Sequence, residues 1–182
     1  MNFIIGADFS FSCPCLCLHS GDIFSLKNCQ FYYLTDKKKF VRTGQFTGTL
    51  HSEYKSQEER IDKITSWAIS HIPKNSKVFL EGYSFGSRSG LMFNIGELGG
   101  LLKHKFYCNL IEFELVPPTA VKKLATSKGN AKKDLMYSAF YNETTFDLLA
   151  ELQTKVIGGN PQSDIVDSYY LAKYGFEKQK MA

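Results

Sequence analysis

Four acidic residues stand at positions from which a fold can bring their carboxylates together. Asp8 follows the apolar run at residues 2–7, and Glu81 ends the run KVFLE at residues 77–81. Asp164 and Asp167 lie three residues apart in a segment where Asn160 suits a helix N-cap and the proline after it suits the first helical position. A spacing of three places both carboxylates on one face of a helix, where they repel each other unless a cation lies between them.

These carboxylates predict a site for hard divalent cations. Acids at strand ends lie where open α/β sheets form their ligand sites. Carboxylate oxygens suit Mg²⁺ or Mn²⁺, which also take phosphate oxygens of a substrate. Two such ions about 3.5–4 Å apart promote phosphodiester hydrolysis. Each acid taken singly also fits an ordinary role, as a strand-end acid or as part of a solvent-facing helix start.

The elements that must position these acids follow an α/β order. Apolar runs predict five strands, at residues 2–7, 15–19, 29–34, 77–80 and 106–114. Helical patterns cover residues 57–71, 89–103, 118–124, 130–142 and 161–175, and the polar segment 36–52 is expected to be a loop or an irregular hairpin. We therefore expect a five-stranded mixed sheet flanked by helices.

Length and composition indicate an ordinary globular chain. Its 182 residues predict a single domain over residues 1–182, 43% of them are hydrophobic, and the net charge is only +4. No apolar run reaches the roughly 18 residues of a membrane span, and the first residues lack the basic n-region expected of a signal peptide. We expect an intracellular protein with no membrane partner: cytoplasmic, nucleoid-associated, or viral and acting in a host cell.

The cysteines are expected to be free thiols with a packing role. Five cysteines are an odd number, and Cys13, Cys15 and Cys17 lack the CxxC spacing of zinc sites. Alternation along a strand places all three on one face as small apolar residues. Pro14 between them indicates an edge strand or an irregular strand start.

Four segments in order make the chain resemble the RuvC-type Holliday junction resolvases, within the RNase H-like (retroviral integrase) superfamily. These are IIGADFSFSCPCLCL at the start, VFLEG at residues 78–82, PTAVKKLATSKGNAKKDLM at residues 118–136 and SDIVDSYYLAKYG at residues 163–175. Each segment alone is a weak signal, but the ordered set spans nearly the whole chain. The resemblance implies an RNase H-like fold.

The resemblance also implies an activity and a set of site residues. It implies a homodimer that cuts two strands of a four-way DNA junction and leaves 5′-phosphate ends, with two Mg²⁺ ions per active site, Mn²⁺ as a substitute and no small-molecule cofactor. It places the metal ligands at Asp8, Glu81, Asp164 and Asp167. Lys122 matches one functional lysine of the family, and Lys133, with Lys132 as its close competitor, lies near a second.

The sequence departs from the family pattern at three places. Phe9 follows the first aspartate where the family has proline or a small residue. The segment after Glu81 differs from the bacterial pattern, and it makes Tyr83 and Phe85 candidates for stacking on DNA bases as well as for packing the loop. The basic cluster at residues 37–42 has no counterpart that we can assign. These departures indicate a divergent, and in one interpretation viral, member.

Other functions stay open. The same fold and metals serve enzymes that cut RNA–DNA hybrids, flaps or replication forks, and the lysines at residues 121–133 fit any of them. A non-catalytic nucleic-acid-binding module is a second alternative, which the four carboxylates oppose. A nucleotide-binding enzyme is disfavoured because GxGxxG and GxxxxGK[ST] are absent and the chain is too short for two actin-like domains. The four histidines show no ligand spacing for a zinc nuclease.

Overall fold

The protein is built on one six-stranded sheet. The computed structural model describes residues 3–82 and 89–181. The strand order is β4-β3-β2-β1-β5-β6, and β2 alone runs antiparallel to its neighbours. The strands are β1 (Phe3–Asp8), β2 (Cys15–His19), β3 (Cys29–Thr35), β4 (Phe46–Leu50), β5 (Ser76–Glu81) and β6 (Glu112–Val116). The predicted mixed α/β class is confirmed, and the predicted number of five strands is wrong.

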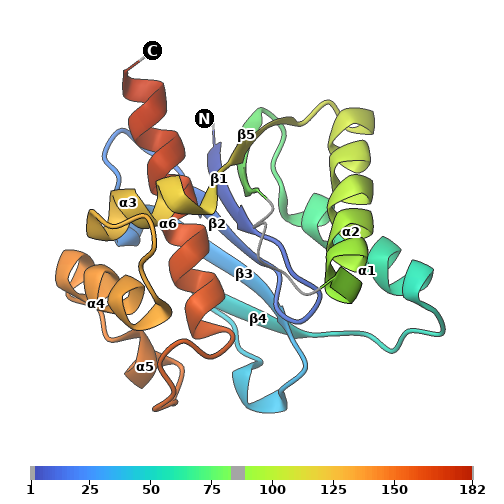
Figure 1. Ribbon diagram of the computed structural model, residues 1–182, viewed down its shortest axis with the longest axis horizontal. Coiled ribbons are helices and arrows are strands. Elements are labelled where there is room, and N and C mark those ends of the chain that lie inside the picture. The colour runs from blue at the N-terminus through green and yellow to red at the C-terminus, as the bar shows by residue number, and fades with distance from the viewer. Residues whose placement is uncertain (1–2, 83–88, 182) are drawn as a thin grey trace.

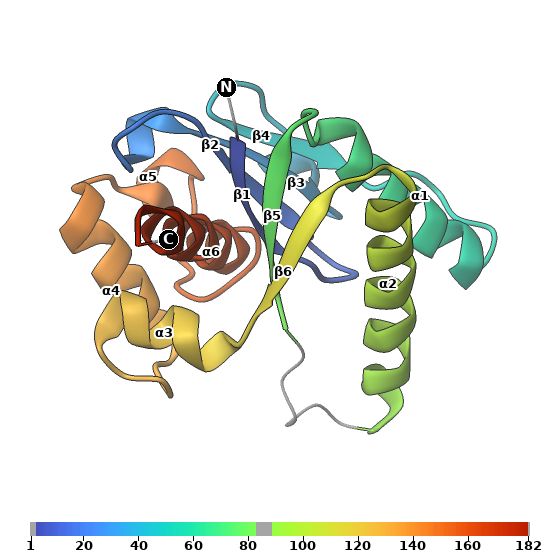
Figure 2. The same ribbon diagram turned by 90° about the horizontal axis from the view of Figure 1, so that it is seen from above.

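Helices cover both faces of this sheet (Figures 1 and 2). One face carries α1 (Gln57–His71) and α2 (Ser89–Cys108). The other carries α3 (Pro118–Thr126), α4 (Lys133–Thr144), the short α5 (Leu148–Glu151) and α6 (Gln162–Lys180). Two 3₁₀ turns, η1 (Leu26–Asn28) and η2 (Lys38–Phe40), flank β3. No helix in the described part of the chain is long and apolar enough to cross a bilayer.

The extra strand, β4, lies in the segment that the sequence predicted to be a loop. It has two buried positions, Phe46 and Gly48. A Cβ at Gly48 would overlap the Tyr33 ring and the Phe40 carbonyl. Packing therefore requires glycine at this position. Because glycine is unfavourable inside a strand, the sequence of this segment did not predict one.

The predicted strand at residues 106–114 is wrong in its first half. Phe106 instead completes a helical stripe with Leu98 and Leu102, all three of which are buried, so α2 runs on to Cys108. The strand begins only at Glu112. Two smaller differences concern the helices that follow: α4 begins at Lys133 rather than at residue 130, and α5 was not predicted.

The start of α6 also differs from the prediction. The helix begins at Gln162, and Pro161 occupies the N-cap position that we expected for Asn160. The side chain of Asn160 instead accepts a hydrogen bond from the Ser163 hydroxyl at 3.3 Å and donates one to Ser12 at 3.1 Å. The residue thus joins the helix start to the loop that follows β1.

Alternation along β1 and β5 sorts their side chains between two cores. Ile5, Ala7, Val78 and Leu80 face α1 and α2, whereas Ile4 and Phe79 face α6. Because successive residues of a strand point to opposite faces, Asp8 and Glu81 share the face of Ile4 and Phe79. Both acids therefore point towards α6.

The α6 backbone lies directly on β1 because glycines replace side chains at the crossing. A Cβ on Gly6 would overlap the carbonyl oxygen of Ser168 and the amide nitrogen of Ala172. One on Gly175 would overlap the ring of Phe79. This close approach sets how far the α6 side chains stand from the sheet.

The cysteines in β2 and just before it occupy the expected face. Cys13, Cys15 and Cys17 are buried free thiols in the core beneath α6. Pro14 directly precedes β2, which lies between β1 and β3, so the edge-strand interpretation is wrong and that of an irregular strand start is right.

Candidate active site at the carboxyl edge of the sheet

Asp8 and Glu81 are neighbours across two parallel strands. The register pairs Gly6 with Phe79 and Ala7 with Leu80, and the two acids occupy the next position on each strand. Adjacent strands lie about 4.8 Å apart, so the two carboxylates leave the sheet side by side.

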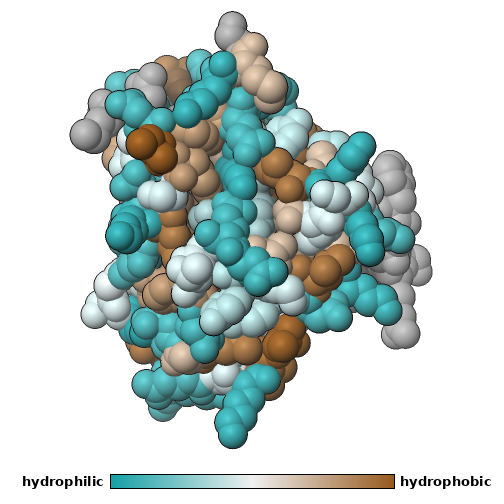
Figure 3. Space-filling model, turned by 90° about the vertical axis from the view of Figure 1, so that its left-hand side faces the viewer, coloured by the Kyte–Doolittle hydropathy of each residue, from teal (hydrophilic) through white to brown (hydrophobic). Residues whose placement is uncertain are grey.

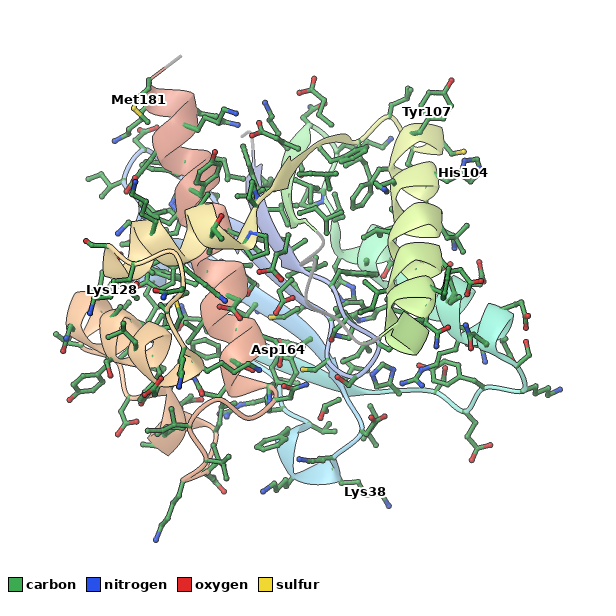
Figure 4. All side chains as sticks on the ribbon, viewed as in Figure 1. Lys38, His104, Tyr107, Lys128, Asp164 and Met181 are labelled. Carbon is green, nitrogen blue, oxygen red and sulfur yellow. The ribbon has the colours of Figure 1, made fainter. Side chains whose placement is uncertain are left out.

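The α6 helix brings the other two acids to the same place. Ser168 contacts β1 at Gly6, and Asp8 lies two residues beyond Gly6, about 7 Å along the strand. Asp164 lies four residues before Ser168, about 6 Å along a helix that runs in the opposite direction. Asp164 is almost fully buried, with 6% of its surface exposed, and Asp167 is half-buried one turn later. Figure 4 shows Asp164 at the start of α6, beside the sheet.

The four acids perturb one another's ionisation. Burial, then the charges of Glu81, Asp164 and Asp167, hold the pKa of Asp8 well above its ordinary value. Burial is also the largest cause that raises the pKa of Glu81 to about 7, of Asp164 to about 7 and of Asp167 to about 6. Such mutual effects require the four groups to be close together, and strongly shifted groups of this kind are typical of functional sites.

Two lysines oppose this negative charge. The ammonium group of Lys133 lowers the pKa of all four acids, and that of Lys122 lowers the pKa of Glu81 and Asp167. Lys132 is exposed at the N-cap of α4, with no corresponding effect on the acids. Of the two competing lysines, Lys133 is therefore the one that faces the carboxylates.

A pocket of about 470 Å³ brings acids and lysines onto one surface. Its lining includes Glu81 and Asp167 together with Lys122, Lys132 and Lys133. The remaining walls come from the start of α3, the 130–131 segment and Met136. Hydrophilic side chains cover much of the neighbouring face formed by α3, α4 and α5 (Figure 3).

Contacts between α4 and α6 hold Lys133 in this position. The Lys133 ammonium donates to the Ser163 hydroxyl at 3.0 Å, next to Asp164. At the other end of α4, Glu143 accepts hydrogen bonds from Tyr169, Tyr170 and Lys173 of α6. Both ends of α4 are thus held by α6, which fixes the lysine relative to the carboxylates.

The donor chemistry of the site fits divalent cations. Oδ2 of Asp164 is buried without a hydrogen-bond partner, and a buried carboxylate oxygen is rarely left in that state. The excess of carboxylates over lysines leaves negative charge that a cation would neutralise. Among the described residues no three His, Cys, Asp or Glu side chains already stand close enough to form a metal-binding group.

Two thiols beneath α6 have polar neighbours that the sequence did not predict. The Cys13 thiol lowers the pKa of the nearby Asp164 carboxyl, and the Cys15 thiol lies 3.3 Å from the Ser168 hydroxyl. Both thiols are also buried in the hydrophobic core, as expected. Burial raises the pKa of the Cys13 thiol above its usual range, so the thiol stays neutral. Alternation along β2 predicted which face the thiols occupy but not that a carboxylate lies on it.

Two predicted site residues cannot be placed. Tyr83 and Phe85 lie outside the described residues, and their stacking role stays a prediction.

A larger cavity, of about 680 Å³, lies elsewhere and lacks comparable chemistry. It is lined by residues of α4 and α5, including Tyr137 and Asp147. Asp147 accepts a hydrogen bond from the Ala150 amide, which caps α5, and another from the Tyr137 hydroxyl. The acid in this cavity therefore serves the local structure.

Comparison with known proteins identifies the fold. No family model and no curated protein matches the sequence. Among solved structures, one of RuvC from Thermus thermophilus superposes with a TM-score of 0.60 at 14% identity and covers 98% of this chain and 96% of its own. The six-stranded mixed sheet flanked by helices is thus an RNase H-like fold.

The particular protein that the fold resembles is RuvC. A second structure, of T. thermophilus RuvC in complex with a Holliday junction substrate, gives a TM-score of 0.56 at 10% identity over the same shares of both chains. The predicted RuvC-type fold is confirmed over nearly the whole chain.

Proposed function

We propose that this protein is a metal-dependent endonuclease that cuts branched DNA, with the four-way junction as its substrate. The observation that carries the proposal is the cluster of four acids, whose charges affect one another's ionisation, beside a pocket where Glu81 and Asp167 meet lysines, all on a RuvC-type fold. The junction in one of the similar structures supports branched DNA as the substrate class.

The carboxylates would hold the cations. Asp8, on the inner strand β1 and within the field of the other three acids, would be a ligand, and Asp164 offers a buried oxygen without another partner. Two Mg²⁺ ions, or Mn²⁺ in their place, would supply the electrophilic stabilisation that in-line phosphodiester hydrolysis needs.

The lysines would hold the substrate. Lys133 and Lys122 reach the pocket from α4 and α3, and a DNA phosphate there would replace part of the carboxylate charge that they now face. Hydrogen bonds to a phosphate oxygen become stronger as negative charge builds up on it during attack by water. When the 3′ oxygen is the leaving group, hydrolysis leaves a 5′-phosphate and a 3′-hydroxyl.

We also propose that the protein acts as a homodimer. Cutting two strands of a junction symmetrically requires two active sites, and the described part of the chain contains one such acid cluster. Large apolar side chains that remain exposed on and beside α2 and β6 are candidates for the contact, namely Phe93, Tyr107, Leu110, Phe113 and Leu115. Sedimentation equilibrium gives the oligomeric state directly.

The predicted intracellular location also stays a prediction.

A side-by-side cleavage assay tests the proposal. Synthetic four-way junctions, replication forks and RNA–DNA hybrids are incubated with the enzyme and Mg²⁺, and an Asp8→Asn variant serves as the control. We expect junction cleavage by the wild type and binding without cleavage by the variant. Cleavage of the hybrid alone would refute the junction-resolvase function, and equal activity of the variant would refute the assigned site.

A further inference from the structure

Three consecutive lysines, Lys37, Lys38 and Lys39, form a basic turn that the proposed active site does not use. All three are exposed, and none of them forms an ion pair with an acid among the described residues. They begin two residues after β3 ends at Thr35. Their position therefore depends on which edge of the sheet β3 leaves.

Strand direction brings the basic turn to the edge that carries the acids. β2 is antiparallel to both β1 and β3, so β1 and β3 run the same way. Asp8 pairs with Cys15, and Cys15 pairs with Tyr33, which places Tyr33 level with Asp8 at about 10 Å across the sheet. Lys37 lies four residues beyond Tyr33, at the carboxyl edge from which Asp8 and Glu81 leave the sheet.

The basic turn is held firmly by the residues around it. Phe40, which ends η2, is buried in the core beneath α6, and its carbonyl accepts a hydrogen bond from the Tyr33 hydroxyl at 2.8 Å. Arg42 then pairs with the backbone of Gly48 and forms an ion pair with Glu151 of α5. These contacts draw the turn to the same side of the sheet as α6 and leave its lysines facing solvent.

The lysines also lie close together over one apolar base. The ammonium groups of Lys37 and Lys39 lie 5.9 and 4.8 Å from the centre of the Phe40 ring. Three adjacent positive charges repel one another, and a polyanion that approaches from solvent relieves that repulsion. Because the backbone is already fixed by its anchors, little conformational entropy is lost when an anion binds.

The turn and the lysines of α3 and α4 flank the acid cluster from different sides. In Figure 4 Lys38 lies below Asp164, whereas Lys128, in the loop between α3 and α4, lies to its left. A duplex carries one phosphate per strand for about every 3.4 Å of its axis, so the 10 Å from Asp8 to the level of Tyr33 corresponds to about three base pairs. The turn begins four residues beyond Tyr33, up to about 13 Å further, so a DNA arm that lies over the carboxylates needs only several base pairs to reach it.

We propose that Lys37, Lys38 and Lys39 form a second phosphate-binding surface, which holds the backbone of the DNA substrate on the β3 side of the active site. This inference rests on the proposed function, since it assigns further contacts to the same substrate. The turn supplies charge at a fixed position and reads no base sequence.

The test measures binding of a labelled synthetic four-way junction in EDTA over a range of salt concentrations. The triple variant Lys37→Gln/Lys38→Gln/Lys39→Gln removes the charges but keeps Phe40 and Arg42. The matched control, Lys27→Gln/Lys74→Gln/Lys180→Gln, removes the same charge from exposed lysines at the opposite edge of the sheet. Circular dichroism and thermal unfolding show that each variant is folded.

We expect the two triple variants to differ. Each phosphate contact contributes about 0.9 to the slope of log K against log salt, so the turn variant should lose about 2–3 from the slope and bind about 10- to 100-fold more weakly near 0.1 M salt. The control should lose less than about one from the slope. A Lys37→Arg/Lys38→Arg/Lys39→Arg variant should bind as the wild type does, because it keeps the three charges.

Two results would overturn the inference in distinguishable ways. Equal slopes for the turn variant and its control, with wild-type binding intact, would refute the second phosphate-binding surface alone. Absence of salt-dependent junction binding by the wild type would refute the proposed function, and the inference would fall with it.

Discussion

We expect the burial of Asp164 to make the metal-free protein less stable at neutral pH than in mild acid. Its pKa rises from an ordinary value of 3.8 to about 7. One pKa unit corresponds to about 1.4 kcal/mol, so ionising this carboxyl in the folded chain costs on the order of 4 kcal/mol. The unfolded chain releases the proton near pH 4 and the folded chain near pH 7. Stability is therefore lost as the pH rises between these values.

Replacing Asp164 with Asn removes this loss. We expect Asp164→Asn to resemble the wild type near pH 4 and to be more stable by on the order of 2–4 kcal/mol at pH 8. The lower end allows for a weaker contact with Cys13 and for compensating ionisation of the other acids. For a chain of this size, that difference raises Tm by about 4–16 °C.

Urea and thermal unfolding in EDTA at pH 4.5, 6 and 8 measure the effect. An Asp22→Asn variant, which changes an exposed turn acid, serves as the control and should follow the wild type at every pH. Addition of Mg²⁺ at pH 8 should stabilise the wild type much more than Asp164→Asn. The reasoning is refuted if wild type and Asp164→Asn lose the same stability between pH 4.5 and pH 8, or if the variant is the less stable protein at pH 8.

Three further predictions concern the neighbouring elements. Gly6→Ala places a methyl group against the α6 backbone, and because neither element can yield cheaply we expect a loss of at least about 2–3 kcal/mol, measured by urea unfolding, together with lost cleavage. Lys133→Ala should weaken junction binding and lower the salt slope by about one, whereas Lys132→Ala should change both less; equal effects would contradict the assignment of Lys133. Replacing Mg²⁺ with Ca²⁺ should preserve binding and suppress cleavage in a gel assay, and brisk cleavage with Ca²⁺ would contradict the proposed metal chemistry.

The sequence determined the elements whose patterns are local. The stripe of Ile61, Ile64 and Ala68 predicted α1, whose Ser56 cap accepts a hydrogen bond from the Glu59 amide. Apolar runs that end in an acid predicted β1 and β5, and the spacing of Asp164 and Asp167 predicted a shared helix face. These predictions succeeded because periodicity, caps and strand ends depend on residues that are close together in the chain.

Elements whose identity depends on distant contacts could not be predicted in this way. β4 has only Phe46 and Gly48 as buried positions. Gly48 must be glycine because a side chain there would overlap Tyr33 of the neighbouring strand and the Phe40 carbonyl. The apolar residues after 105 fit either a strand or a helix, and burial of Phe106 in line with Leu102 decides for the helix.

The same division holds for the candidate site. Residue types and spacing singled out its four acids. Only the packing of α6 on Gly6 shows that these acids lie close together. The distance between β1 and α6 depends on this glycine, whose contacts on α6 are more than 150 residues away in the sequence. The contact of Cys13 with Asp164 and the common edge of Asp8 and the basic turn likewise follow from strand order and direction. Those are properties of the assembled sheet, which no local pattern contains.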